Sequence, residues 1–309
     1  MWGQNGTSVN EFILVGFTSH PTQQRLLLVL CLAISLATML GNSLIIILIW
    51  VDSHLHTGMY FFIGNLSVLD MLFTIITVPQ MLVHLASGVN AISFNRCMAQ
   101  LDLSLSCGMT ECFILAFMAY DHYVAICHPL RYPTIMRKQV YVKMAAACWV
   151  AAFFNSAALT AITVSFPFCG PNRINHFYCE LPAMLQLACM DTYRAEVLIF
   201  ALSVIVLMLP FTFIVISYIH IARVVLSMRS AKGRQRAFST CATHLTVVTL
   251  FYSTIGFTYL QPRSKRAANQ EKRAAVFYAL VSPMLNPIIY SLRNKEVKGA
   301  FAKVMRKAT

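Results

Sequence analysis

Long apolar stretches recur along this chain and are separated by short polar segments. About twenty successive apolar residues allow a helix to cross a lipid bilayer. Five of the stretches carry no formal charge, and two others are interrupted only by acidic residues. The pattern therefore predicts seven membrane-spanning helices, at residues 26–51, 59–83, 97–121, about 143–166, 197–222, 237–261 and 274–292.

The composition indicates a membrane protein with a single domain. Of the 309 residues, 58% are hydrophobic and only 11% are charged, which is too apolar for a soluble domain of this length. We expect an all-α membrane protein with an extracellular N-terminal segment at residues 1–25, a seven-transmembrane helix bundle at 26–292 and a cytoplasmic tail at 293–309. Apolar and basic residues of the tail fall on opposite faces, which predicts a short amphipathic helix on the inner membrane surface.

The distribution of positive charge predicts the orientation of the chain. The formal net charge is +13, and 15 of the 24 Lys and Arg fall at residues 131–143, 223–236 and 293–307. If the N-terminus lies outside, all three segments are cytoplasmic, as the positive-inside tendency requires. This placement favours a lipid membrane over nucleic acid as the partner. Asn5 begins an Asn-Gly-Thr glycosylation sequon, which also fits an outer N-terminus at the plasma membrane.

Ten cysteines include no Cys-x-x-Cys pair, so the sequence does not indicate a zinc or thioredoxin-type site. Cys97, Cys169, Cys179 and Cys189 fall on the predicted outer side, where the environment is oxidising and disulfides form. Four cysteines permit three pairings, and their spacing does not choose between them.

Two carboxyl groups lie near the middle of predicted spans. Asp70 and Glu111, if charged, would each cost about 2.5 to 3.5 kcal/mol to insert into a bilayer. The cores of the predicted spans contain no Lys or Arg that could pair with them. Protonation, a shared proton or a bound cation would stabilise these acids. The alternative is a purely structural polar network.

Small and polar residues form a stripe along the third predicted span. Ser104, Gly108 and Glu111 recur at three- and four-residue spacing, so they share one face of a helix. Such a stripe lets a ligand approach the helix. Close packing against another helix is the alternative explanation.

Four motifs occur in order along the chain. They are MAYDHYVAICHP at 118–129, HFYCELP at 176–182, RAFSTCATHL at 236–245 and PMLNPIIY at 283–290. Together they resemble the olfactory receptor family of rhodopsin-like G-protein-coupled receptors. Two positions depart from the family pattern: His122 stands where the family carries arginine, and Gly58 stands where its LHTPMY motif has proline.

The resemblance implies a receptor that binds a small, mostly hydrophobic volatile ligand in the outer part of the bundle. Binding would tilt the sixth helix and activate a stimulatory heterotrimeric G protein, which raises cyclic AMP. It implies no enzymatic activity and no cofactor apart from a sodium ion. The ligand-binding residues that it indicates are Ser104, Leu105, Gly108, Met109, Leu202, Ser203, Val206, Tyr252, Ile255, Tyr259 and Ala279.

The resemblance also assigns roles to polar residues and cysteines. It implies disulfides from Cys97 to Cys179 and from Cys169 to Cys189. It places sodium beside Asp70, with Asn286 nearby. Hard cations prefer oxygen ligands, which Glu111, Asn42 and Ser67 can add. Those that it places in activation and G-protein coupling are Asp121, His122, Tyr123, Tyr218, His244, Pro287 and Tyr290.

The histidine at position 122 predicts weaker coupling to the G protein than arginine would give. Arginine stays charged at any physiological pH, whereas histidine is only partly protonated near pH 7. The coupling is therefore also expected to depend on pH.

Two other classes of protein also place acids inside a membrane. A transporter or channel with an intramembrane cation site commonly has inverted repeats and broken helices, but seven spans do not divide into two halves. An intramembrane enzyme is not supported, because HExxH, GxSxG and a glycine-rich phosphate loop are all absent from the sequence. The sequence identifies neither the odorant nor the oligomeric state.

Overall fold

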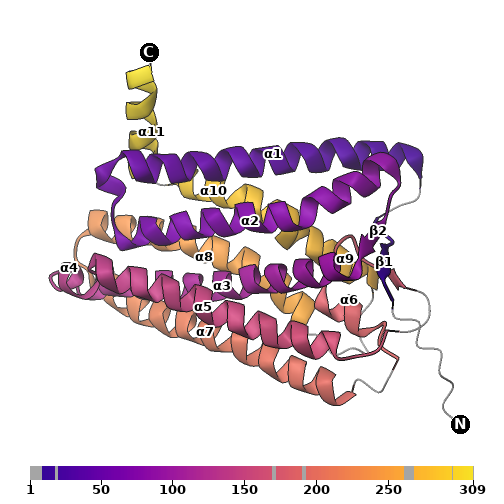
Figure 1. Cartoon of the computed structure of the whole chain (residues 1–309). Helices are drawn as coiled ribbons and strands as arrows, with labels where there is room; N and C mark the ends of the chain where they lie inside the picture. The colour runs from indigo at the N-terminus through magenta and orange to yellow at the C-terminus, as the bar shows by residue number, and fades with distance from the viewer. Residues whose placement is uncertain are drawn as a thin grey trace, which may run out of the picture.

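The computed structural model describes residues 9–17, 20–168, 172–189, 193–260, 268–293 and 295–308. Its long helices lie side by side in one elongated bundle (Figure 1). The first five are α1 (Pro21–Val51), α2 (Gly58–Ser87), α3 (Phe94–Cys127), α5 (Lys138–Val164) and α7 (Tyr193–Ser227). All five contain a stretch that is long and apolar enough to cross a membrane, and a sixth such stretch is Lys272–Ser291.

The predicted sixth span corresponds to α8 (Ala231–Tyr259). This helix packs in the same bundle, beside α7 and α10 (Figure 1). Its sequence contains many serines and threonines together with His244, and its apolar character is therefore weaker than that of the other long helices. Among the described residues six helical stretches thus qualify as membrane spans, and the seventh crossing stays a prediction.

The helix ends differ from the ends of the apolar stretches. α3 extends six residues, nearly two turns, beyond residue 121 and ends at Cys127. α5 ends at Val164, within two residues of the predicted end at residue 166. Pro167 follows shortly after, and a proline disfavours helical conformation at the residue before it, here Phe166. The last predicted span comprises α9 (Ala268–Val276), a π-helical turn η3 (Phe277–Val281) and α10 (Ser282–Arg293).

A small sheet corrects the expectation of a purely helical fold. β1 (Glu11–Leu14) lies between β2 (Ala91–Ser93), to which it is antiparallel, and β3 (Arg173–Ile174), to which it is parallel. Phe12 and Leu14 of β1 are buried. Strand β1 of the N-terminal segment is therefore part of the folded structure at one end of the bundle, which we call the sheet end (Figure 1).

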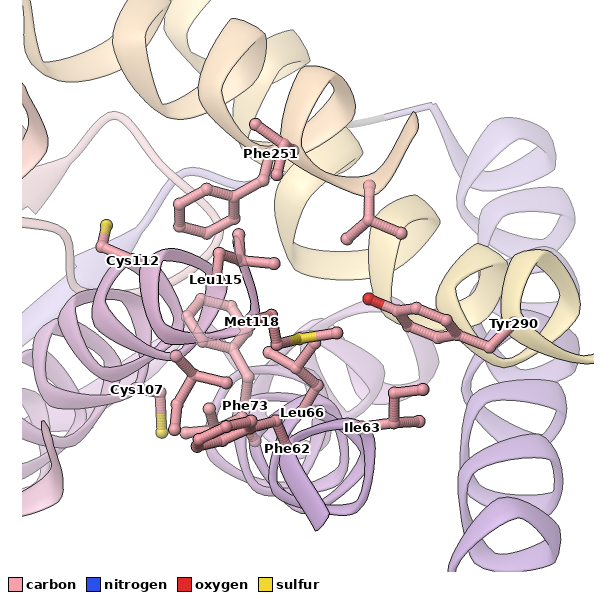
Figure 2. Close-up of a cluster of buried hydrophobic side chains, with 14 of the residues drawn as sticks. Phe62, Ile63, Leu66, Phe73, Cys107, Cys112, Leu115, Met118, Phe251 and Tyr290 are labelled. Atoms are coloured by element: carbon pink, nitrogen blue, oxygen red, sulfur yellow. The ribbon is translucent and has the colours of Figure 1, made fainter. Parts of the chain in front are cut away.

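Aromatic and branched side chains from α2, α3, α8 and α10 fill the centre of the bundle (Figure 2). Close helix contact, rather than release of water, stabilises such packing in a membrane. Gly41 shows how tight it is. A Cβ atom at this position would lie 2.9 Å from the Cγ atom of Pro287, so glycine allows α1 and α10 to approach each other.

Short helices occupy the end of the bundle opposite the sheet. They are η1 (Ser53–Leu55), α4 (Tyr132–Ile135) and α11 (Lys295–Ala308) (Figure 1). The predicted helix in the tail is therefore confirmed, and its place on a membrane surface stays a prediction. The Tyr60 hydroxyl donates to Glu296 Oε2 at 2.7 Å, and Lys303 Nζ lies 3.5 Å from Asp52 Oδ1. These contacts connect α11 to the bundle.

Candidate functional site

A cavity lies near the sheet end of the bundle, between α3, α7 and α8. It holds about 570 Å³ of space that protein atoms do not fill. Most of its lining is apolar, with a few hydroxyl groups. The lining residues are Phe73, Ser104, Leu105, Gly108, Met109, Cys112, Leu159, Tyr178, Leu181, Ser203, Val206, Leu207, Ile255, Tyr259 and Tyr278. We call this space the outer cavity.

The structure brings most of the predicted ligand-binding residues together around the outer cavity. They come from α3, α7 and α8, which are far apart in the sequence. The predicted residues that line it are Ser104, Leu105, Gly108, Met109, Ser203, Val206, Ile255 and Tyr259.

Three predicted ligand-binding residues do not line the outer cavity. Leu202 is half-buried and packs against neighbouring apolar side chains. Tyr252 packs against Phe211, with ring centroids 5.0 Å apart. Ala279 is fully buried in the core. It lies in the π-helical turn, whose wider winding changes the facing positions, and Tyr278 faces the cavity instead.

Sequence reasoning missed several residues of the cavity wall: Phe73, Cys112, Leu159, Tyr178, Leu181, Leu207 and Tyr278. Two of them, Tyr178 and Leu181, belong to the outer loop that carries HFYCELP. Their neighbour Cys179 provided a signal, because a disulfide from Cys179 to the start of the third span would hold this loop over the bundle.

The disulfide between Cys97 and Cys179 is confirmed. It joins the first turn of α3 to the outer loop, and the backbone N–H of Cys179 also donates to Gln100 Oε1 at 2.8 Å. Cys189 is also disulfide-bonded, and its predicted partner Cys169 lies outside the described residues. The predicted glycosylation site Asn5 lies outside them as well.

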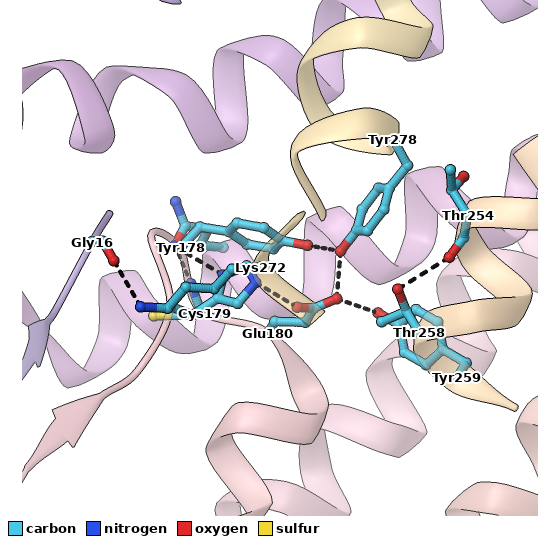
Figure 3. A network of polar contacts seen from close by, with 11 residues as sticks. Gly16, Tyr178, Cys179, Glu180, Thr254, Thr258, Tyr259, Lys272 and Tyr278 are labelled. Atoms are coloured by element: carbon cyan, nitrogen blue, oxygen red, sulfur yellow. Dashed lines mark hydrogen bonds and ion pairs between the residues drawn. The ribbon is translucent and has the colours of Figure 1, made fainter. Parts of the chain in front are cut away.

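A buried polar network connects the outer loop to α8 and to the π-helical turn (Figure 3). The carboxylate of Glu180 is its centre, with an exposed fraction of 2%. Glu180 Oε1 accepts from the hydroxyl of Tyr259 at 3.3 Å and from the hydroxyl of Tyr278. Glu180 Oε2 lies 2.9 Å from His176 Nε2, at ion-pair distance. The two tyrosines thus connect this network to the wall of the outer cavity.

Lys272 extends the contacts at the sheet end to the N-terminal segment (Figure 3). Its ammonium group is buried and donates to the backbone carbonyl of Gly16 at 2.8 Å. Gly16 has a φ of 67°, in the left-handed region that favours glycine, and a Cβ atom there would lie 2.7 Å from the His84 ring. Lys272 of α9 thus has a structural role at the sheet end.

A second, smaller cavity contains both intramembrane acids. Asp70 and Glu111 line it, and it shares four wall residues with the outer cavity: Phe73, Gly108, Ile255 and Tyr278. The Asn286 amide donates to both carboxylate oxygens of Asp70 at 3.1 Å.

Asn42 and Ser67, which were predicted to bind sodium, do not line the cavity that contains these acids. The Asn42 amide donates instead to the backbone carbonyls of Thr38 and Pro283, each at 3.0 Å. Ser67 is buried one helical turn from Asp70 and is not part of the cavity wall. Among the described residues no group of three or more His, Cys, Asp or Glu could hold a metal ion. Oxygen atoms of Asp70 and Glu111 nevertheless fit the preference of a hard monovalent cation.

At the opposite end of the bundle, Asp121 is buried and accepts a hydrogen bond from the Tyr132 hydroxyl at 2.8 Å. Burial and the neighbouring Asp121 carboxylate raise the pKa of Tyr132, so this hydroxyl keeps its proton and donates. Gly58 lies against the same carboxylate, because a Cβ atom there would be 2.7 Å from Asp121 Oδ1. The glycine that replaces the family's proline therefore leaves room for Asp121.

His122 is buried and stacks on His244, with ring centroids 5.2 Å apart and planes 22° apart. His122 Nδ1 lies 2.6 Å from the Met118 carbonyl oxygen. The Tyr218 hydroxyl lies 2.8 Å from His244 Nδ1. Predicted switch residues of α3, α7 and α8 are thus in direct contact.

The other predicted activation residues are spread around this cluster. Tyr123 is half-buried, and its hydroxyl lies 3.2 Å from His128 Nε2. The Tyr290 hydroxyl is buried and has no hydrogen-bond partner in the described part of the chain. Pro287 lies within α10, against Gly41.

Comparison with known proteins shows the family to which this chain belongs. The model of the olfactory receptor family matches residues 30–308 of this chain. Olfactory receptor 10A3 of Homo sapiens is 45% identical over 304 residues, which cover 98% of this chain and 97% of that protein. Olfactory receptor 2F1 of Homo sapiens is 48% identical over 307 residues, covering 99% and 97%. The olfactory receptor-like protein OLF3 of Canis lupus familiaris is 48% identical over 305 residues, covering 99% and 96%.

These matches extend over nearly the whole chain. They agree with the family that the four sequence motifs indicate and with helices that are long and apolar enough to cross a membrane. They place the chain among multi-pass receptors that sense odorants, and outside the enzymes. The chain therefore belongs to the olfactory receptor family of G-protein-coupled receptors.

Proposed function

We propose that this chain is an odorant receptor of the plasma membrane, with seven helices that cross the bilayer and an extracellular N-terminus. A small, mostly hydrophobic volatile molecule binds in the outer cavity. Binding activates a stimulatory, olfactory-type G protein at the opposite end and raises cyclic AMP. The observation that carries this proposal is the apolar outer cavity, whose wall comes from α3, α7, α8 and the outer loop.

The positions of the polar clusters support this function. Pockets between bundled helices are common sites for small apolar ligands. The outer cavity contacts α8 through Ile255 and Tyr259, and the same helix carries His244 in the stacked pair at the other end. A ligand that shifts α8 would therefore disturb the contact between His122 and His244.

Gly108 offers a direct test of the site. A Cβ atom at Gly108 would meet nothing within 4 Å, so a larger side chain can enter the cavity without a backbone clash. A panel of chemically diverse odorants, read with a cyclic-AMP reporter in transfected cells, first identifies activating ligands. Gly108→Leu should then abolish or reduce the response at least tenfold, because its side chain occupies the space of the ligand.

Gly299→Leu is the matched control, because a Cβ atom there also meets nothing within 4 Å and α11 lies at the other end of the bundle. It should keep the same half-maximal ligand concentration. Equal ligand sensitivity of Gly108→Leu and the unchanged chain, at equal surface expression, would place the site elsewhere. Flux of ions or solutes without any cyclic-AMP response would instead favour a transporter or channel.

We also propose that Asp70 and Glu111 share a sodium ion or a proton in the second cavity. Two carboxyl groups in one buried space repel each other when both are charged, and a cation or proton removes this repulsion. Asn286 supports the Asp70 carboxylate with two hydrogen bonds. Because the two cavities share wall residues, the charge state of the acids can influence the ligand site.

A further inference from the structure

Five hydroxyl groups line the outer cavity: those of Ser104, Tyr178, Ser203, Tyr259 and Tyr278. A hydroxyl group has one proton to donate and two lone pairs that can accept. If its proton is already donated within the protein, a ligand meets only its lone pairs. The direction of the hydrogen bonds inside the protein therefore determines which polar groups of a ligand can be satisfied.

Glu180 accepts hydrogen bonds from two of these hydroxyl groups (Figure 3). Tyr259 and Tyr278 both donate to Glu180 Oε1. The other carboxylate oxygen lies 2.9 Å from His176 Nε2. An ionised carboxylate can only accept hydrogen bonds, and three potential donors surround this one. The two tyrosine protons therefore point to Glu180 and away from the cavity.

Tyr178 also donates its hydroxyl proton within the protein. Its hydroxyl contacts the Tyr278 hydroxyl, and the Tyr278 proton is already donated to Glu180. Tyr178 must therefore be the donor in this contact, which leaves its lone pairs for a ligand. Ser104 is arranged in the same way on α3, because its hydroxyl donates to the Leu101 carbonyl at 3.0 Å.

We propose that the outer cavity selects neutral ligands that carry a hydrogen-bond donor, namely alcohols and phenols, over aldehydes, ketones, esters and ethers of the same shape. This inference rests on the proposed function of the cavity as the odorant site. An alcohol donates to a lone pair of Tyr178 or Ser104 and can accept from Ser203 on α7. A carbonyl compound leaves those lone pairs unsatisfied. A carboxylate ligand is disfavoured further by the negative charge of Glu180.

One neutral hydrogen bond made or lost changes an affinity by roughly threefold to tenfold. A buried acceptor that faces another acceptor adds to the difference, because both lose water without gaining a partner. The expected preference for an alcohol over the matching aldehyde is therefore on the order of tenfold.

The experiment uses the purified full-length chain in detergent and measures thermal stabilisation against ligand concentration. The ligands are an eight-carbon primary alcohol and the aldehyde, methyl ether and carboxylate of matching length. The alcohol should bind about tenfold more tightly than the aldehyde and the ether, and the carboxylate most weakly. Equal affinities of alcohol and aldehyde would overturn the proposal, and so would a failure of all four compounds to bind.

Two kinds of variant test the cause of the selectivity. A glutamine at position 180 can donate as well as accept, so Glu180→Gln allows a tyrosine proton to turn toward the cavity. In Glu180→Gln the ratio of alcohol to aldehyde affinity should fall to less than threefold. Ser104→Ala keeps Glu180 intact and removes one acceptor. It should weaken alcohol binding about threefold and leave aldehyde binding unchanged, whereas a purely structural effect would weaken both.

Ser203→Ala is the matched control for Ser104→Ala, because it removes a hydroxyl that can donate to either ligand. It should weaken alcohol and aldehyde to a similar extent. A cyclic-AMP assay with the same ligands separates this inference from the proposed function. Alcohol-selective binding without any cyclic-AMP response would contradict the function alone. Activation by aldehydes and alcohols at equal concentrations would contradict the selectivity alone.

Discussion

At the scale of single residues, His122 is the position where this receptor differs most clearly from the family pattern. Its imidazole is buried against His244, which contacts Tyr218. The two ring centroids are 5.2 Å apart, so a charge at position 122 acts directly on this cluster. Arginine would instead carry a permanent charge beside Asp121. The substitution therefore changes the electrostatics of the proposed switch.

His122→Arg should raise the amplitude of the cyclic-AMP response, because a permanent cation restores the donor that the family uses at this position. The measurement is the maximal response per receptor at the cell surface, with a ligand found in the odorant panel. His56→Arg adds the same group at an exposed position after η1, at the same end of the bundle, and serves as the control. Unchanged amplitude in His122→Arg would show that the histidine is sufficient for full coupling.

Asp70→Asn should change both the basal activity and the dependence of the ligand response on sodium. The amide has nearly the shape of the carboxylate but removes the charge that would hold a cation or a proton. Basal signalling and ligand response are compared in media in which sodium is replaced by a larger cation. Asp102→Asn is the control, because Asp102 accepts from Thr160 at 3.3 Å and lines neither cavity. If both properties stay unchanged in Asp70→Asn, the proposed cation or proton site is wrong.

Residues of the outer cavity were predictable where their spacing along a helix determines which face of that helix they occupy. Ser104 and Gly108 follow from the spacing along α3, and both line the outer cavity. Ala279 does not line it, because the π-helical turn has no signal in apolar periodicity. Tyr178 was missed because its position depends on how the outer loop folds over the bundle.

At the scale of elements, the close contact of α1 with α10 depends on Gly41. Gly41→Ala would place a Cβ atom 2.9 Å from Pro287 Cγ, and both helices would have to move apart. Overpacking of this kind costs about 1 to 3 kcal/mol. The melting temperature of the purified protein should fall accordingly.

Gly64→Ala on α2 separates this packing effect from a general effect of glycine in a helix. Its Cβ atom would lie 3.6 Å from Ile49 Cδ1, an ordinary van der Waals contact. This control should be neutral or stabilising by up to about 1 kcal/mol, because alanine favours a helix over glycine. A Gly41→Ala protein as stable as Gly64→Ala would contradict the close approach.

The long helices were predictable because each needs about twenty apolar residues, and such runs are visible without any structure. The sheet was not predictable, because β2 and β3 have only three and two residues and their pairing depends on long-range contacts. The end of α5 was predictable within two residues, and Pro167 provides a local signal for it.

At the scale of the whole molecule, the N-terminal segment closes the sheet end of the bundle through β1 and through the contact of Gly16 with Lys272. Lys272→Met should destabilise this closure by about 1 to 3 kcal/mol, because a charged hydrogen bond to a carbonyl is lost. Limited proteolysis of the N-terminal segment and the melting temperature measure the effect. Arg273→Met, at an exposed neighbouring position, should leave the rate of proteolysis and the melting temperature unchanged within experimental error. Equal behaviour of the two variants would contradict a role of Lys272 in the closure.

The order of the strands in the sheet has a consequence for biosynthesis. β1 leaves the ribosome first, but it pairs with residues 91–93 and 173–174, which are translated later. β1 must therefore stay unpaired until residues 91–93 have been made, and its second partner follows only after the fourth long helix. A nascent chain stopped before residue 173 would lack one of the two edges to which this strand binds.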